Sequence, residues 1–66
     1  KLNWIIASLG YMKSTNGSIP YKIHCHDLEQ AGRVFQASAN REYSSFFRTQ
    51  LEAIKWCNTY ERQMNE

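Results

Sequence analysis

The chain has 66 residues, of which 42% are hydrophobic, 14% aromatic and 21% charged, and its formal net charge is +2. A chain of this length forms one domain at most, because it buries only about 60% of the surface that its unfolded form exposes. The aromatic content excludes a disordered tail, and no run approaches the roughly 18 apolar residues of a membrane span.

The first half of the chain predicts two strands joined by a turn. Residues 4–12 (WIIASLGYM) are rich in aromatic and β-branched residues and carry no helix cap, so we expect one strand there. Residues 19–26 alternate like a strand with one buried side. This alternation places Lys22, His24 and His26 on one face, and on the other Ile19, Tyr21, Ile23 and Cys25. Asn16-Gly17, between the two segments, is a strong signal for a tight hairpin turn.

Residues 27–39 favour a first helix. Asp27 is a candidate N-cap with Gln30 three positions later. Apolar residues then follow at helical spacing, namely Leu28, Ala31, Val34 and Phe35. Asn40 is a candidate left-handed stop, whereas Gly32 weakens the helix by about 1 kcal/mol relative to alanine. The alternative is a third strand over residues 33–38, because Val34 to Ala37 also suits an extended backbone.

The last third of the chain predicts a strand followed by the longest helix. Residues 42–48 (EYSSFFR) contain three aromatics and no helical stripe, so we expect a strand. Thr49 and Glu52 form a capping box, and the stripe behind them predicts a helix over residues 50–64. The stripe consists of Leu51, Ile54, Cys57, Tyr60 and Met64, flanked by Ala53 and Trp56. The predicted fold is therefore a small single α+β domain over residues 1–66, in the order β-β-α-β-α, with an antiparallel sheet and both helices packed on one face.

Residues 45–54 (SFFRTQLEAI) resemble the strand-into-helix step near the end of plant AP2-type DNA-binding domains. An aromatic residue, a threonine cap and a Glu-Ala pair occur there in similar order. The likeness covers about ten residues, and the arginine- and tryptophan-bearing strands that those domains use on DNA have no match in residues 1–40. We interpret it as a shared capping solution rather than kinship, and carry over no binding residue.

A looser resemblance is to small phage-encoded inhibitors, such as phage inhibitors of host RNA polymerase and some anti-CRISPR proteins. Several consist of a strand, a helix beginning Leu-Glu-x-Ala, and another strand. Residues 21–25, 28–31 and 43–47 follow that order here. This likeness is one of fold and has no diagnostic motif, so it implies an inhibitor or adaptor function without assigning residues.

The sequence indicates neither a catalytic centre nor a cofactor. His24 and His26 point to the same side of the predicted strand, but Cys25 points away, so a tetrahedral metal site lacks two ligands. No Gly-rich phosphate loop, HExxH or GxSxG motif is present. Cys25 and Cys57 are too few for a disulfide-stapled scaffold, which favours reduced cysteines and a cytoplasmic protein. We predict no enzyme, no metal and no membrane partner.

Aromatic residues exceed what the core of a small domain needs. The chain holds two Trp, four Tyr and three Phe, and exposed aromatics mark partner surfaces. The predicted function is a non-enzymatic module that binds a larger protein or complex, as an inhibitor or adaptor. The predicted partner-binding residues are Trp4, Tyr11, Tyr43, Phe46 and Trp56. Self-association through the third strand or the second helix is a further possibility.

Nucleic-acid binding is the alternative function. Residues 1–49 carry six basic and three acidic residues, whereas residues 50–66 carry two basic and three acidic ones. A sheet face with basic side chains beside Tyr43 or Phe46 suits phosphates and bases. The residues predicted for this role are Lys13, Lys22, His24, His26 and Arg48.

Overall fold

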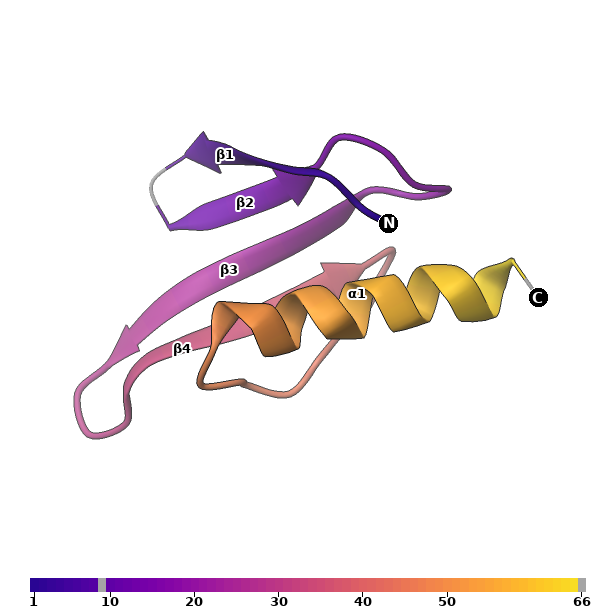
Figure 1. Cartoon of the computed structure of the whole chain (residues 1–66). Helices are drawn as coiled ribbons and strands as arrows, with labels where there is room; N and C mark the ends of the chain where they lie inside the picture. Colours follow the sequence, from indigo (N-terminus) through magenta and orange to yellow (C-terminus); the bar gives the residue numbers. More distant parts are fainter. Residues whose placement is uncertain (9, 66) are drawn as a thin grey trace.

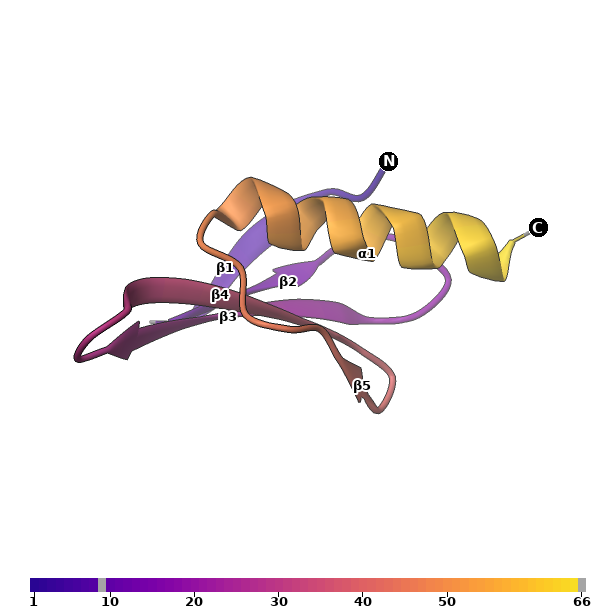
Figure 2. The ribbon, with the colours of Figure 1, turned by 90° about the horizontal axis from the view of Figure 1, so that it is seen from below.

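The structure, a computed structural model, describes residues 1–8 and 10–65. Its elements are β1 (Trp4–Ser8), β2 (Tyr11–Ser14), β3 (Tyr21–Leu28), β4 (Gly32–Ala39), β5 (Glu42–Tyr43) and α1 (Gln50–Met64). The strands form one antiparallel sheet in chain order, β1 to β5. The helix lies across one face of this sheet, and the described residues place no helix on the other face (Figures 1 and 2).

The α+β class is confirmed, but the predicted order β-β-α-β-α is wrong, because residues 27–39 do not form a helix. They contribute the end of β3, a turn and β4, and all eight residues of β3 pair with β4, from Tyr21↔Ala39 to Leu28↔Gly32. Gly32 has a φ of 76°, which suits the tight turn and not a helix. The alternative strand over 33–38 was the correct interpretation. Asn40, with a φ of 55°, stands in the turn between β4 and β5 and ends no helix.

The predicted strand over residues 4–12 is two strands in the structure. A turn after Ser8 separates β1 from β2, and Gly10 has a φ of 95° there. Leu9, part of that predicted strand, lies outside the described residues. The predicted turn at Asn16-Gly17 does connect two antiparallel strands, but as part of a longer connection between Ser14 and Tyr21. Gly17 has a φ of 111°, and a Cβ on it would meet a Leu2 methyl at 2.8 Å.

Helix α1 agrees with its prediction. The Thr49 hydroxyl accepts a hydrogen bond from the Glu52 amide (3.2 Å) and donates one to the Glu52 carboxylate (2.9 Å). Ala53 and Cys57 are buried from the helix, while Leu51, predicted on the apolar stripe, is 59% exposed. The sheet contributes the rest of the core through alternate residues, namely Tyr21, Ile23, Ala37 and Ala39. Leu2, which precedes β1, completes this cluster.

Glu61 of α1 forms hydrogen bonds with the connection between β2 and β3 and with the first residue of β3. Its carboxylate accepts hydrogen bonds from the Tyr21 hydroxyl (2.7 Å) and from the amide and hydroxyl of Ser18 (both 2.8 Å). The Tyr21 hydrogen bond, followed by those of Ser18, outweighs partial desolvation and lowers the pKa of Glu61 below its ordinary value. The contacts therefore stabilise the fold more when Glu61 is ionised than when it is protonated.

We expect Glu61→Gln to lower the melting temperature at neutral pH, because it removes the charge that accepts these hydrogen bonds. The native pKa of Glu61 is depressed, so its contribution is present above the ordinary value of 4.5 and is lost as the pH falls below it. Thermal unfolding followed by circular dichroism between pH 7 and pH 3 tests this. The variant should lose less stability on acidification than the native chain. Glu29→Gln, in the exposed turn between β3 and β4, is the control and should melt like the native chain.

Candidate functional site

The pairing register assigns each strand residue to a face of the sheet. Cross-strand partners share a face, and alternate residues along a strand point to opposite faces. Tyr21, Ile23, Ala37 and Ala39 belong to the core under α1, so their neighbours along the strands point to the helix-free face. That face carries Ile5, Tyr11, Lys13, Lys22, His24, His26, Val34, Gln36, Ser38 and Tyr43.

A row of rings crosses the helix-free face. Tyr11 stacks with His24 at a centroid distance of 5.5 Å and an interplanar angle of 25°, and His24 stacks with His26 at 6.3 Å and 29°. Phe46 meets His26 edge to face at 5.6 Å. The row therefore joins β2, β3 and the segment after β5. We call Tyr11, His24, His26 and Phe46 the ring row.

The connection from β5 to α1 explains how Phe46 reaches the ring row. Phe47 forms a bridge with Phe35 of β4 through two backbone hydrogen bonds of 2.7 Å. Phe47 packs against the core, so Phe46 points to the opposite face, as expected for consecutive residues in an extended segment. The Ser44 hydroxyl supports this path by accepting a hydrogen bond from the Ala37 amide at 2.8 Å.

Two lysines lie beside the ring row. Lys13 and Lys22 are cross-strand partners on β2 and β3, both are exposed, and the Lys22 ammonium lies 5.8 Å from the centre of the Tyr11 ring. Burial, and then the positive charges of His26 and Lys22, lower the pKa of His24 below its ordinary value. A free imidazole at this position is therefore neutral at pH 7, and an anion placed against it would favour its protonation.

Carboxylates are absent from the helix-free face among the strand residues that the structure describes. Asp27 lies on the other face and pairs with Arg33 at 3.3 Å. Glu29 is in the turn before β4, Glu42 pairs with Ala39 of the helix-side set, and Glu52 and Glu61 are on α1. The positive side chains of the helix-free face thus have no acidic neighbours among its described strand residues, whereas the other side of the sheet carries both signs of charge.

The structure places the predicted nucleic-acid residues together with one exception. Lys13, Lys22, His24 and His26 share the helix-free face. Arg48 is exposed between the Phe47 bridge and the Thr49 cap, and the register does not assign it to that face. The contact of Tyr11 with the histidines was not predicted from the sequence. Tyr11 and Lys13 are alternate residues of β2 and therefore share a face. This pattern was missed because residues 4–12 were predicted as one strand, which ended before Lys13.

The predicted partner-binding residues are divided between two sides of the molecule. Tyr11, Tyr43 and Phe46 lie on the helix-free face, where Tyr43 is 66% and Phe46 54% exposed. Trp4 and Trp56 are partly buried and pack against the core on the helix side. The five residues therefore do not form one surface.

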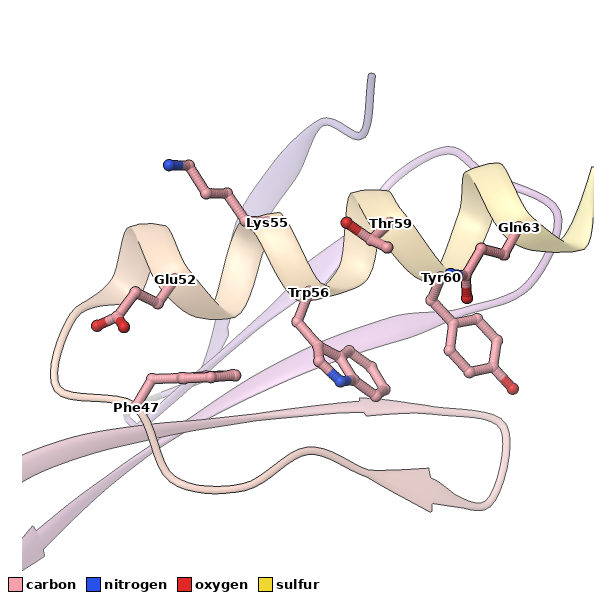
Figure 3. Close-up of a pocket in the computed structure, with 7 residues that line it drawn as sticks. All are labelled: Phe47, Glu52, Lys55, Trp56, Thr59, Tyr60 and Gln63. Carbon is pink, nitrogen blue, oxygen red and sulfur yellow. The ribbon is translucent and has the colours of Figure 1, made fainter.

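Trp56 belongs to a shallow groove between α1 and the segment that follows β5. Figure 3 shows the rings of Phe47, Trp56 and Tyr60 directed into it, while Lys55 points away. The groove has a volume of about 360 Å³. Trp56 and Tyr60 lie 5.3 Å apart, and Tyr60 meets the buried Tyr21 edge to face at 6.1 Å. The rings of Phe47, Trp56 and Tyr60 are partly buried and pack against the core at this side of the helix.

Other chemistry finds little support within residues 1–8 and 10–65. They contain no group of three or more His, Cys, Asp or Glu arranged to hold a metal ion. Both cysteines are free thiols, and burial raises the pKa of Cys57 to about 12, which opposes its use as a nucleophile. Over the same residues, no helix has the length and apolar content needed to cross a membrane.

Comparison with known proteins leaves the function to be argued from the residues themselves. The chain matches no protein-family model, no curated protein and no solved structure. The Leu28–Ala31 segment, on which the likeness to phage inhibitors relied as a helix start, forms the end of β3 and the following turn. That resemblance therefore loses its structural basis.

Proposed function

We propose that the chain is a non-enzymatic nucleic-acid-binding module that uses the helix-free face of its sheet. The observation that carries this proposal is the separation of charge, with two lysines and two histidines on a face whose described strand residues include no carboxylate. A polyanion is the partner for which such a face is complementary, and nucleic-acid backbones are the commonest extended polyanions that proteins bind.

Each part of the face has a role in this proposal. Lys13 and Lys22 neutralise phosphates as point charges. His24 and His26 donate ring N–H groups to phosphate or base edges, and they do so best when protonated. Tyr11 and Phe46 hold the imidazoles in place through the ring contacts and supply apolar surface toward sugars and bases. With two lysines as the permanent charges, the affinity is moderate and depends on pH.

Fluorescence anisotropy with labelled oligonucleotides of about 20 nucleotides, duplex and single-stranded, tests the proposal. At pH 8 we expect binding that weakens about tenfold between about 50 and 200 mM salt, because two phosphate contacts release two counterions. At pH 6 a bound phosphate favours the protonated form of His24, so affinity rises and the salt dependence steepens. The sign follows from the lowered pKa of His24, since a group that is neutral when free takes up a proton on binding an anion.

The double variant His24→Gln/His26→Gln separates the contribution of the imidazoles from that of the lysines. It should bind at pH 8 nearly as the native chain does and should lose the gain at pH 6. Circular dichroism at both pH values verifies that each protein is folded. No binding of any oligonucleotide at about 50 mM salt, at either pH, would refute the proposed function.

A protein partner is the second candidate, and the exposure of Tyr43 and Phe46 favours it. Exposed aromatic rings are frequent hot spots of protein interfaces. The inhibitor or adaptor function expected from the sequence would then use the same face. Binding of this kind depends weakly on salt, survives reversal of the lysine charges and disappears in Tyr43→Ala/Phe46→Ala, whereas nucleic-acid binding gives the opposite salt and lysine results.

A further inference from the structure

The outer edge of β1 has backbone hydrogen-bonding groups with no neighbouring strand among the described residues. In the described residues the sheet ends at β1 on one side and at β5 on the other. Figure 1 shows β1 as the outermost strand, with β2 on its inner side only. β5 has two residues, so it offers little to a strand that would pair there, whereas β1 has five. An edge strand presents a row of backbone N–H and C=O groups that another strand can pair with.

The backbone groups of Trp4 and Ile6 point out from this edge. The Asn3 carbonyl accepts a hydrogen bond from the Thr15 amide at 2.9 Å, so Asn3 faces β2. Hydrogen-bonding direction alternates along an antiparallel strand, so Ile5 also faces β2, opposite Lys13, and the residues between them face away. The donors and acceptors of Trp4 and Ile6 therefore remain available to a further strand.

The side chains of β1 lack the features that commonly protect an edge. Trp4–Ser8 contains no charged residue and no proline. Ile5 is 47% exposed on the helix-free face, and Ile6 is 79% exposed on the opposite face. The register shift between Ile6 and Ser8 distorts the end of the strand, which leaves Trp4–Ile6 as its regular part.

We propose that β1 pairs antiparallel with β1 of a second copy of this chain, around a two-fold axis at Ile5. In this register Trp4 of each copy lies opposite Ile6 of the other, and their outward backbone groups exchange hydrogen bonds. The arrangement also pairs an aromatic with a β-branched side chain on one face, which is a favourable cross-strand combination. On the other face the two Ile5 side chains meet.

A second copy is the occupant that this edge fits best. The exposed segment is uncharged, so it pairs with itself without repulsion. The opposite edge of the sheet is too short for head-to-tail association, so the same edge is used twice and the assembly closes as a dimer. The sheet then continues across both copies and joins their helix-free faces. This inference stands on β1 alone and does not depend on what those faces bind.

Analytical ultracentrifugation between about 10 µM and 1 mM protein tests the dimer. We expect the native chain to approach twice its monomer mass as concentration rises, and Ile6→Lys to remain monomeric. Leu28→Lys replaces another exposed apolar residue, which pairs with Gly32 beside the β3–β4 turn and not with β1, and should dimerise like the native chain. A native chain that stays monomeric throughout, or an Ile6→Lys variant that dimerises unchanged, would overturn the proposal.

A disulfide tests the register. Ile5 would form a non-hydrogen-bonded pair with its copy, with Cα atoms about 4.5 Å apart, a spacing within the range that disulfides span. Ile5→Cys should therefore oxidise to a covalent dimer that disappears on reduction. The oxidised native chain, with Cys25 and Cys57 alone, and Leu51→Cys are the controls and should stay mostly monomeric on a non-reducing gel. A dimer no more abundant in Ile5→Cys than in Leu51→Cys would exclude this register.

Discussion

Lys13→Glu/Lys22→Glu is expected to weaken nucleic-acid binding by at least about a hundredfold at about 100 mM salt. These two residues are cross-strand partners and carry the permanent positive charge of the strand residues on the helix-free face. Each lysine that no longer contacts a phosphate lowers the number of counterions released on binding by about one. The salt dependence of any remaining binding should therefore also become shallower by about two units of slope. Anisotropy titrations at three salt concentrations measure both effects.

The control for this variant reverses two charges elsewhere. Lys55 and Arg62 are exposed on α1, so Lys55→Glu/Arg62→Glu changes the net charge equally without altering the helix-free face. We expect it to retain affinity within a few-fold of the native chain and to keep the native salt slope. Equal losses of affinity in both variants would indicate a response to net charge alone, and the helix-free face would then not be the site.

Ile23→Ala is expected to cost about 3 kcal/mol of unfolding free energy. Ile23 is one of the largest fully buried side chains, and it lies between the β2 and β4 partners Met12 and Ala37. Removal of its outer carbons leaves a cavity that the surrounding sheet and helix cannot fill. For a domain of this size the loss corresponds to about 15 °C in Tm, which is a large part of its total stability.

Urea unfolding followed by circular dichroism measures this cost. Ile23→Val should lose only about 1 kcal/mol, because it removes a single methyl group at the same position. Leu51→Ala removes as many carbon atoms as Ile23→Ala does, but from a side chain that is 59% exposed, so it should change stability little. If Ile23→Ala cost no more than Leu51→Ala, the core would not be centred under α1.

The helix was predictable from the sequence because its signals are local. Thr49 and Glu52 are three residues apart at the start of the helix, where the Thr49 hydroxyl accepts a hydrogen bond from the Glu52 amide and donates one to the Glu52 carboxylate. Ala53 and Cys57 are four residues apart and are buried on one side. Such information is contained within one or two helical turns, so it needs no knowledge of distant partners.

Strand β4 was predicted as a helix because its strongest determinant is not local. Four residues have helical spacing, but Leu28 ends β3, Ala31 lies in the turn, and Val34 and Phe35 belong to β4 and pair with β3. The period-two signal was present as Phe35, Ala37 and Ala39, which all belong to or contact the core. Small alanines carry little weight in a hydrophobicity pattern, and burial under α1 decides their orientation.

The candidate face was predictable in part. Alternation in residues 19–26 placed Lys22, His24 and His26 together, and the structure confirms their common side. The contacts of Tyr11 with His24 and of Phe46 with His26 depend on strand register and on the path from β5 to α1. Neither contact is encoded within a short window, so Tyr11 was predicted only on a protein-binding surface, and Phe46 was expected beside the basic side chains only in the alternative function.

The burial of Cys57 beneath α1 makes this thiol a reporter of helix detachment. It has no solvent exposure, and its raised pKa keeps it protonated at neutral pH. A thiol reagent can modify Cys57 only after the helix moves from the sheet, so the labelling rate measures how often that opening occurs. Because the helix-free face lies on the opposite side of the sheet, a bound partner that slows this labelling would do so by stabilising the fold, without itself covering the thiol.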